Sequence, residues 1–303
     1  VLSEKEKRAI GKAPTTDAQA YDFYLRGRQF FHQFRRKGFD FARQMFERAI
    51  EIDPRYSRAY AGVADCCSFL YMYYDASQAN LQGADSASRT ALDLDPDLAD
   101  AHASRGLAVS LSKRYPEAEQ EFKIAIRLNP KLFEAHYFFA RACFQQGKMA
   151  EAAELFEQAS RVNPDDYQAP SLLALAYDGL GRKAEALAAY RRSLRICEKH
   201  LELHPDDGRA LYIGAGSLCQ IGQNERAAEW ATRALAMDPE DPTVLYNVGF
   251  AFSVLGKIEE SVECLEKAVE RGMGQKEWFE NDPDLNAVRT HPRFQVLLSR
   301  LQD

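Results

Sequence analysis

Prolines recur along this chain at a spacing that is typical of a repeated structural unit. Six of them stand at positions 54, 96, 130, 164, 205 and 239, so the gaps are 42, 34, 34, 41 and 34 residues. Three gaps are identical, and the other two are longer by eight and seven residues. Self-similarity with a period of about 20 to 50 residues is the sequence signature of stacked repeats, in which each unit buries its apolar face against the next.

Other residue types keep fixed distances from these prolines. The tenth residue after each proline is small: Ala64, Gly106, Ala140, Ala174, Ala215 and Gly249. The seventeenth residue after each of the last four is glycine: Gly147, Gly181, Gly222 and Gly256. A small residue lets two helices approach closely, and a glycine in the left-handed conformation ends a helix. Since proline disfavours helix in the residue before it, the pattern predicts two antiparallel helices per unit.

The repeating residues resemble a known family. The positions that carry the resemblance are Ala135, His136, Phe139, Ala140, Cys143, Gly147, Ala152, Phe156, Ala159 and Pro164, which are similar to the tetratricopeptide repeat (TPR). The unit that ends at Pro239 is similar too, although Ala231 replaces the usual bulky aromatic residue. The resemblance implies an all-α fold, a right-handed α-α superhelix of about seven helix-turn-helix repeats with a C-terminal capping helix.

Three departures from the period have simple structural explanations. The excess of eight residues falls near residues 68–79 of the second unit, and the excess of seven precedes Pro205 in the fifth. Because seven residues are about two α-helical turns, the second helix of the fifth unit can lengthen without changing the face that it presents. In the first unit we expect the turn between the helices at residues 35–38.

The period predicts the organisation of the chain. We expect residues 20–273 to form the repeat array of seven repeats and residues 274–303 to cover its last apolar face. Both ends of the array resemble the C-terminal TPR region of bacterial multidomain signalling and regulatory proteins. This resemblance implies that residues 1–19 are a linker or helix that follows an upstream domain.

Composition limits the classes of partner. Lys and Arg number 39 against 45 Asp and Glu, a formal charge of −6, whereas a protein that grips phosphates over its whole surface is basic. We therefore expect no nucleic acid, and Arg35-Arg36-Lys37 indicates a solvated turn rather than an RNA contact. No apolar run reaches the roughly 18 residues of a membrane helix, so we expect no membrane. Six cysteines without a C-x-x-C pair favour a reduced, cytoplasmic setting.

Residue patterns that carry chemistry are sparse. The sequence has no phosphate-binding G-x-x-x-x-G-K-[ST] loop, no G-x-S-x-G and no H-E-x-x-H. Cys197, His200 and His204 share one helical face and could contribute to a zinc site. A helix end whose histidines complement the C-terminal dipole, with Cys197 in the packing, is the interpretation we prefer. We expect no catalytic residue, metal or cofactor.

The first helix of each repeat lines the inner wall of such an array. Counting from the prolines gives candidate residues for a partner-binding groove: Tyr137, Phe138, Arg141, Phe144, Leu172, Leu175, Tyr212, Ile213, Tyr246, Asn247 and Phe250. Aromatic residues and arginine are favoured at binding hot spots. Because Lys, Asn and Arg are few on this wall, we expect a protein or peptide with apolar anchors rather than an acidic C-terminus.

Two other functions compete with a non-catalytic interaction scaffold. An apolar wall or the terminal cap could instead bind a second copy of the chain and form a homo-oligomer. An enzyme with its active site in the groove is a weaker alternative, because no Ser/His/Asp or metal-ligand set converges in the repeat pattern.

Overall fold

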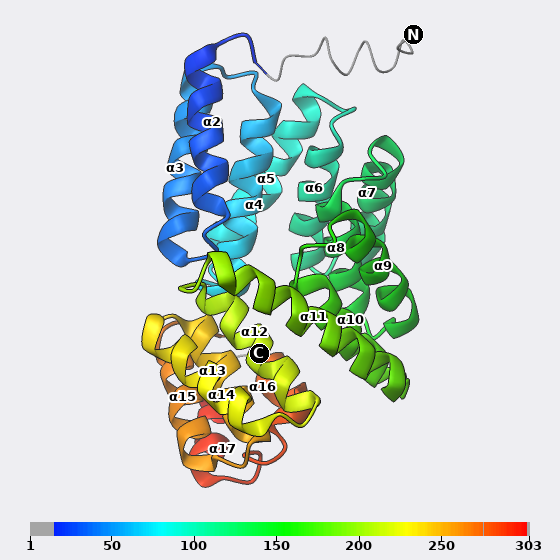
Figure 1. Cartoon of the computed structure of the whole chain (residues 1–303). Helices are drawn as coiled ribbons and strands as arrows, with labels where there is room; N and C mark the ends of the chain where they lie inside the picture. Colours follow the sequence, from blue (N-terminus) through cyan, green and yellow to red (C-terminus); the bar gives the residue numbers. More distant parts are fainter. Residues whose placement is uncertain (1–14, 275, 302–303) are drawn as a thin grey trace. The chain divides into compact units, whose positions relative to one another are not determined.

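The computed structural model describes residues 15–274 and 276–301, and this part of the chain consists of helices and turns without any strand. The predicted all-α fold of helix hairpins is confirmed (Figure 1). The chain divides into two compact units. Unit 1 runs to Tyr71 and resumes from Ser77 to Phe138, whereas unit 2 consists of Met72–Ala76 and all residues from Phe139.

The two units share one construction, in which successive helices form hairpins. Unit 1 is built from α2 (Ala18–Phe31), α3 (Arg36–Ile52), α4 (Ser57–Tyr73), α5 (Gln78–Leu94), α6 (Ala99–Leu111), α7 (Tyr115–Leu128) and the start of α8 (Phe133–Gln145). Unit 2 continues with α9 (Met149–Val162), α10 (Gln168–Gly179), α11 (Lys183–Leu203), α12 (Gly208–Gln220), α13 (Asn224–Met237), α14 (Pro242–Val254) and α15 (Ile258–Glu270). The boundary between the units falls inside α4 and α8.

Close approach of neighbouring helices, within a hairpin and between hairpins, depends on a small residue opposite a large one. A Cβ atom on Gly27 or Gly62 would lie within 2.7 Å of the Phe46 ring, which is buried between α2 and α4. Gly106 faces Phe122 in the same way, at 2.6 Å. Such contacts leave no room for a methyl group, so the small residues found in the repeat pattern set the distance between helices.

Turn conformations follow the predicted glycines. Gly147, Gly181, Gly222 and Gly256 all have φ between 71° and 77°. The next residue closes the turn, as when the Lys148 N–H donates to the Cys143 carbonyl at 3.0 Å. This is the hydrogen-bond pattern of a helix that ends on a left-handed residue.

The turn between α2 and α3 lies earlier than the predicted position at residues 35–38, so that prediction was wrong. Helix α3 already begins at Arg36, and Phe34 has the positive φ, 49°. The Phe34 ring packs against Phe31, Phe39 and Phe69, which fixes the turn earlier. Gly38 lies inside α3, where a Cβ atom would be 2.8 Å from the Phe30 carbonyl oxygen. That glycine is needed for a close helix contact and not for a turn.

Two irregular repeats of unit 2 have clear physical explanations. Helix α11 has 21 residues against 14 in α9, so the seven extra residues lengthen the second helix of the fifth hairpin as predicted. In the next hairpin, Trp230 supplies the bulk that is missing at Ala231. Its ring packs directly on Gly214, where a Cβ atom would lie 2.3 Å from Trp230 Cζ3.

The end of the chain covers the last hairpin of unit 2. Helix α16 (Lys276–Asn281), the 3₁₀ turn η1 (Pro283–Leu285) and α17 (Pro292–Arg300) follow α15. Phe279, Leu285 and Phe294 are fully buried in one cluster with Leu245 and Leu265. The apolar face that the last hairpin would otherwise expose is therefore covered. The domain boundaries at residues 19 and 273 remain predictions, and residues 1–14 lie outside the described residues.

Candidate functional site

A wall built from the first helices of the hairpins runs along unit 1. We call it the first-helix wall of unit 1; it consists of α2, α4, α6 and the beginning of α8. Aspartate side chains begin or stabilise such helices. For example, the Asp17 carboxylate accepts hydrogen bonds from the backbone N–H groups of Gln19 and Ala20 at 2.8 and 3.0 Å. Capping of this kind satisfies donors that have no partner within the helix.

The wall contains a small polar cavity, which we call the Asp65 cavity. Its volume is about 20 Å³. Apart from Leu132, which precedes α8, all its lining residues come from the first helices: Tyr24, Arg28, Arg58, Ala61, Gly62, Asp65, Asp100, Ala103, Ser104, Glu134 and Phe138. Because four helices converge here, the position of each side chain is set by rigid elements and not by a loop.

Asp65 is the residue with the most unusual environment in this cavity. Its Oδ1 atom is buried and has no hydrogen-bond partner, while the Ser104 hydroxyl donates a hydrogen bond to the carboxyl group. Burial raises the pKa of Asp65 to about 7, and the nearby carboxylates of Glu134 and Asp100 add to this effect. The Ser104 hydrogen bond and the charge of Arg28 oppose it.

Arg28 and Glu134 form the charged rim of the Asp65 cavity. The Arg28 guanidinium lies 3.7 Å from a Glu134 carboxylate oxygen, and it also lies 3.3 Å from His32 Nε2. Burial, followed by the charge of Arg28, lowers the pKa of His32. The Tyr24 pKa is raised by burial, with Arg28 acting against this rise. The cavity thus holds an acidic group at Asp65 near Arg28, which already has a carboxylate partner, and Arg58, which is exposed.

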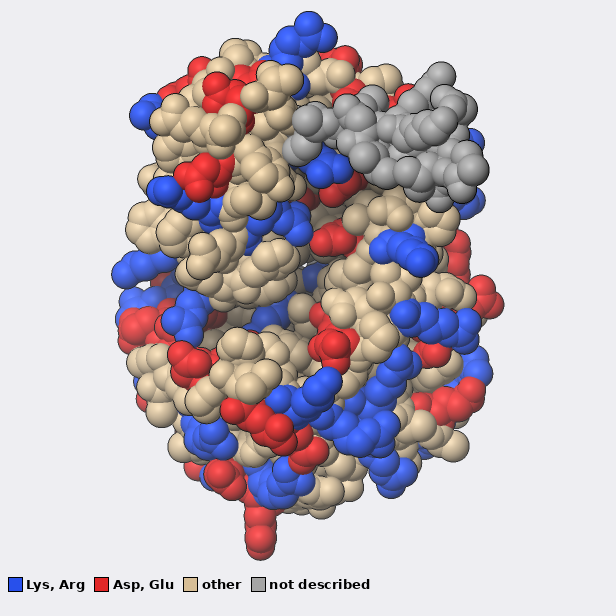
Figure 2. Space-filling view, turned by 45° about the horizontal axis from the view of Figure 1, so that its top comes forward, with Lys and Arg blue, Asp and Glu red and all other residues tan. Residues whose placement is uncertain are grey.

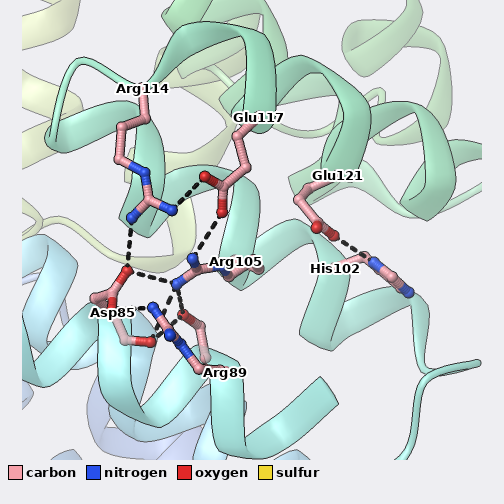
Figure 3. Close-up of polar contacts among 8 residues, drawn as sticks. Asp85, Arg89, His102, Arg105, Arg114, Glu117 and Glu121 are labelled. Carbon is pink, nitrogen blue, oxygen red and sulfur yellow. Dashed lines mark hydrogen bonds and ion pairs between the residues drawn. The ribbon is translucent and has the colours of Figure 1, made fainter. Parts of the chain in front are cut away.

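A second set of charges in unit 1 has a different character (Figure 3). Arg105 is only 5% exposed, and its guanidinium donates to Asp85 at 2.6 Å and to Glu117 at 2.7 Å. Arg114 bonds both carboxylates as well, reaching Asp85 at 3.0 Å. Burial alone would raise the Asp85 pKa, but the hydrogen bond from Arg105 and the charges of three arginines lower it. We call this set the Arg105 network.

Comparison with known proteins decides the family. Family models described as tetratricopeptide repeat match residues 75–133, 112–160, 137–200 and 198–242, and a second such model matches 242–271. The chain belongs to the tetratricopeptide repeat family. TPR arrays are in general non-catalytic scaffolds for protein partners, which is the general function that the fold supports.

Individual relatives show the fold and little more. A TPR protein from Thermus thermophilus superposes with a TM-score of 0.51 at 23% identity, covering 63% of this chain and 98% of that one. The human IFIT1 dimer with PPP-AAAA gives a TM-score of 0.55 at 18% identity, with 86% of this chain and 69% of that one covered. The bacterial protein named "Putative adenylate cyclase 3" from Rhizobium meliloti (strain 1021) is 32% identical over 118 residues. That match covers 38% of this TPR chain and only 20% of the relative.

Tyr137 and Phe138 from the predicted groove set belong to unit 1 and are both 5% exposed. The Tyr137 ring stacks on Phe133 with 5.2 Å between centroids, and Phe138 packs edge-on against Phe69 at 5.8 Å. Phe138 also lines the Asp65 cavity. The structure therefore places one predicted aromatic residue at a polar site that the sequence argument did not single out.

Other predicted residues lie on the first helices of unit 2 and keep part of their apolar surface exposed. Phe144, Leu172, Leu175, Ile213 and Phe250 are all half-buried. They come from α8, α10, α12 and α14, so four consecutive TPR hairpins contribute. We call these five residues the apolar set of unit 2.

The polar and tyrosine members of the predicted set are already engaged within unit 2. The Arg141 guanidinium donates to the Tyr73 hydroxyl and lies over the Tyr73 ring, 5.5 Å from its centroid. The Tyr246 hydroxyl donates to Asp282 at 2.9 Å, and its ring packs edge-on against Phe279. Asn247 Nδ2 donates to the Thr243 carbonyl at 2.8 Å. Tyr212 is 6% exposed and belongs to the core.

Asp65 is not among the residues predicted for the partner-binding groove. Its position on the inner wall follows from the same count that located the aromatic candidates, but aromatic and aliphatic residues were preferred there. A usable signal exists, because Asp65 is the one charged residue between Arg58 and Asp75, in an otherwise apolar helix. A lone carboxylate in such a stretch has a high desolvation cost, which is a physical reason to examine it.

The structure places the possible zinc ligands Cys197, His200 and His204 at the end of α11. Cys197 is fully buried, and burial raises its thiol pKa far above the usual range. His200 Nε2 lies 2.8 Å from Asp207 Oδ2, and the His200 and His204 rings are 4.7 Å apart. Among the described residues, no three His, Cys, Asp or Glu side chains are grouped so that they could hold a metal ion. All six cysteines are buried and free.

The surface and the helices bear on two other classes of partner. Figure 2 shows basic and acidic side chains interspersed over most of the face that it presents. Basic side chains gather at the lower right of this view, and elsewhere on the face the two signs are mixed. Within residues 15–274 and 276–301, no helix combines the length and the apolar character needed to cross a bilayer.

Proposed function

We propose that this TPR chain is a non-catalytic scaffold whose first helices bind a peptide or partner segment, as the regulatory arm of a larger bacterial signalling protein. The observation that carries the proposal is the apolar set of unit 2. Five large apolar side chains on four consecutive first helices remain partly exposed. Apolar surface that is kept accessible on one face of a rigid array is typical of an interaction site.

The role as a regulatory arm rests on a separate observation. The one curated relative named above carries a signalling-enzyme name and aligns with this chain over only a fifth of its length. A TPR region beside an enzyme domain would act by capturing a partner and not by chemistry of its own. The half-buried Leu and Phe residues suit a peptide with apolar anchors, and the expected cytoplasmic location suits such a role.

The proposal is tested with peptides selected from a random display library on the full chain. Leu175→Glu and Ile213→Glu place a charge within the apolar set, so each should weaken a selected peptide at least about tenfold. Leu203→Glu is the matched control, because Leu203 is 78% exposed at the end of a second helix. Normal binding by both first-helix variants would contradict the proposal. Selection of peptides that end in an acidic C-terminus would contradict the apolar-anchor mode.

Self-association is a second candidate with an observation of its own. Tyr21, Leu25 and Phe41 are 42%, 47% and 47% exposed, and all three belong to the first hairpin. Tyr21 and Leu25 are four residues apart, so they share one face of α2. Light scattering over a concentration series, with Leu25→Glu as the comparison, distinguishes a concentration-dependent dimer from a monomer.

A further inference from the structure

The Asp65 cavity contains an acceptor that nothing in the fold uses. Asp65 Oδ1 is buried, lines the cavity and has no hydrogen-bond partner, although Ser104 satisfies part of the carboxyl group. Native proteins pair almost all buried polar atoms, and an exception calls for a physical explanation. A carboxylate oxygen can only accept hydrogen bonds, so the missing group must be a donor.

The charges around the cavity favour a donor that is also a cation. Asp65 and Asp100 have no ion-pair partner among the described residues, while Arg28 already lies 3.7 Å from Glu134. Arg58 is exposed to solvent at the edge. An anion would be repelled by three carboxylates here. A cation would instead be attracted to Asp65 and Asp100, the two that have no ion-pair partner.

Size and lining select among cations. A cavity of about 20 Å³ has room for one water-sized group. The compact ammonium of lysine fits such a space, whereas the planar guanidinium of arginine is larger and needs a flat, forked partner. Tyr24 and Phe138 line the same cavity and offer apolar surface for the methylene stem of a lysine side chain.

Resting on the proposed function, we propose that the Asp65 cavity is the subsite for one lysine side chain of the bound partner. The ammonium group donates a hydrogen bond to Asp65 Oδ1, and its charge is shared with Asp100.

This pairing gives the subsite a defined pH dependence. The ammonium pairs with ionised Asp65, which in the free protein is half protonated near pH 7. The groups that face Asp65 are Tyr24 and Arg28 from α2, Arg58 from α4, Asp100 from α6 and Glu134 from α8. None of these has an ordinary pKa near 7. Below pH 7, lysine binding should therefore release a proton from Asp65. The affinity for lysine should fall by up to about tenfold for each unit by which the pH is lowered.

The direct test uses a probe of the side chain alone. The probe is Nα-acetyl-lysine-N-methylamide, and its Nε-acetylated form is the control probe without charge. Backbone amide signals of Gly62 and Ser104 are followed by NMR on the full chain at pH 8. We expect saturable shifts with the lysine probe at millimolar concentration, at least a tenfold loss with Asp65→Asn, and no loss with Asp93→Asn. Asp93 is an exposed acid on α5, so its variant makes the same charge change outside the cavity.

Three results would overturn the lysine subsite. One is an equal response to the acetylated probe, and another is an unchanged response in Asp65→Asn. The third is no response up to about 50 mM probe, well beyond the range expected for a single side chain, which would mean that the cavity holds a buried water only.

A second experiment separates this inference from the proposed function. The full chain is screened against peptide libraries with lysine, arginine or glutamine fixed at the central position. Enrichment of the lysine library that is lost in Asp65→Asn supports both proposals. Peptide binding without a lysine preference keeps the scaffold function and overturns the subsite. Binding of the lysine probe with no peptide retained from any library keeps the subsite and contradicts the peptide-binding function.

Discussion

Asp65 and Asp85 lie on the two helices of one hairpin, α4 and α5, and differ in how their charge is treated. Asp85 accepts hydrogen bonds from Arg105, Arg89 and Arg114, and its pKa is lowered. Asp65 has one hydroxyl donor, a buried oxygen without a partner and a pKa raised to about 7. The Asp85 carboxylate stabilises the packing of helices, whereas the Asp65 carboxylate weakens the folded state and remains available to a ligand.

The comparison shows how a repeat array separates stability from binding. The Arg105 network joins α5, α6 and the start of α7, where its members satisfy one another (Figure 3). The Asp65 cavity lies on the first helices, where a partner could supply what is missing. Destabilised groups of this kind are typical of binding sites, which is why stability and activity often conflict.

The largest effect is expected from Arg105→Ala. This change leaves Asp85 and Glu117 without their buried partner, so the free energy of unfolding should fall by about 3–5 kcal/mol. Urea unfolding monitored by circular dichroism measures the loss. Arg89→Ala removes a pair to the same carboxylate, but the Arg89 side chain is 60% exposed and should contribute no more than about 0.5 kcal/mol. Equal losses in the two variants would show that the network is not a buried structural element.

Asp65→Asn should act in the opposite direction and raise the stability of the folded protein. The folded-state pKa of Asp65 lies above the ordinary value, so wild type loses stability as pH rises from about 4 to about 7. The variant has no carboxyl group to ionise, and its gain should grow over that range to at most about 4 kcal/mol. Urea unfolding at pH 5 and pH 8 gives the two values. A loss of stability at pH 8 would contradict the unpaired state of Asp65.

Asp85→Asn should change the stability of the folded protein in the direction opposite to Asp65→Asn, and with the opposite dependence on pH. Because the folded-state pKa of Asp85 is lowered, its contribution is present above the unfolded pKa of about 4 and is lost as pH falls through the folded pKa. The variant should lose about 1.5–3 kcal/mol near neutral pH, the range for hydrogen bonds to charged groups. The loss should shrink at pH 3. A pH-independent loss would show that Asp85 acts through packing and not through its charge.

Gly62→Ala tests the helical phase of α4, which places Asp65 in the cavity. The new methyl group would meet the Phe46 ring at about the 2.7 Å found for an added Cβ atom, so we expect a loss of about 1–3 kcal/mol. Thermal unfolding of the variant measures it. An unchanged midpoint would mean that α4 does not present Gly62 to Phe46, and with it that Asp65 is misplaced.

Much of the fold was predictable because repeats make local rules visible. The positive φ of Gly147 and the burial of Ala140 follow from offsets that recur along the chain. The positive φ at Phe34 was not predictable, because it depends on packing against Phe69, a residue of the next hairpin. Trp230 filling the space beside Ala231 was also missed, since the period fixes a position and not the neighbour that compensates for it.

The candidate site was only partly predictable, for a related reason. Counting from the prolines located the first-helix residues, but it could not show that Tyr246 is covered by Phe279 and Asp282. It also could not show that Asp65 lacks a cationic partner, because that depends on Arg28 being paired with Glu134 from another hairpin. Which side chains remain unsatisfied is a property of the packed structure.

The most direct test of the contrast is the titration of the two carboxyl groups by ¹³C NMR of the aspartate side chains in the full chain. The account predicts that Asp65 titrates near pH 7 and that Asp85 titrates below the ordinary value of 3.8. If Asp65 instead titrates in the ordinary range of aspartate, its carboxylate is solvated or paired, and the reserved acceptor on the first-helix wall does not exist.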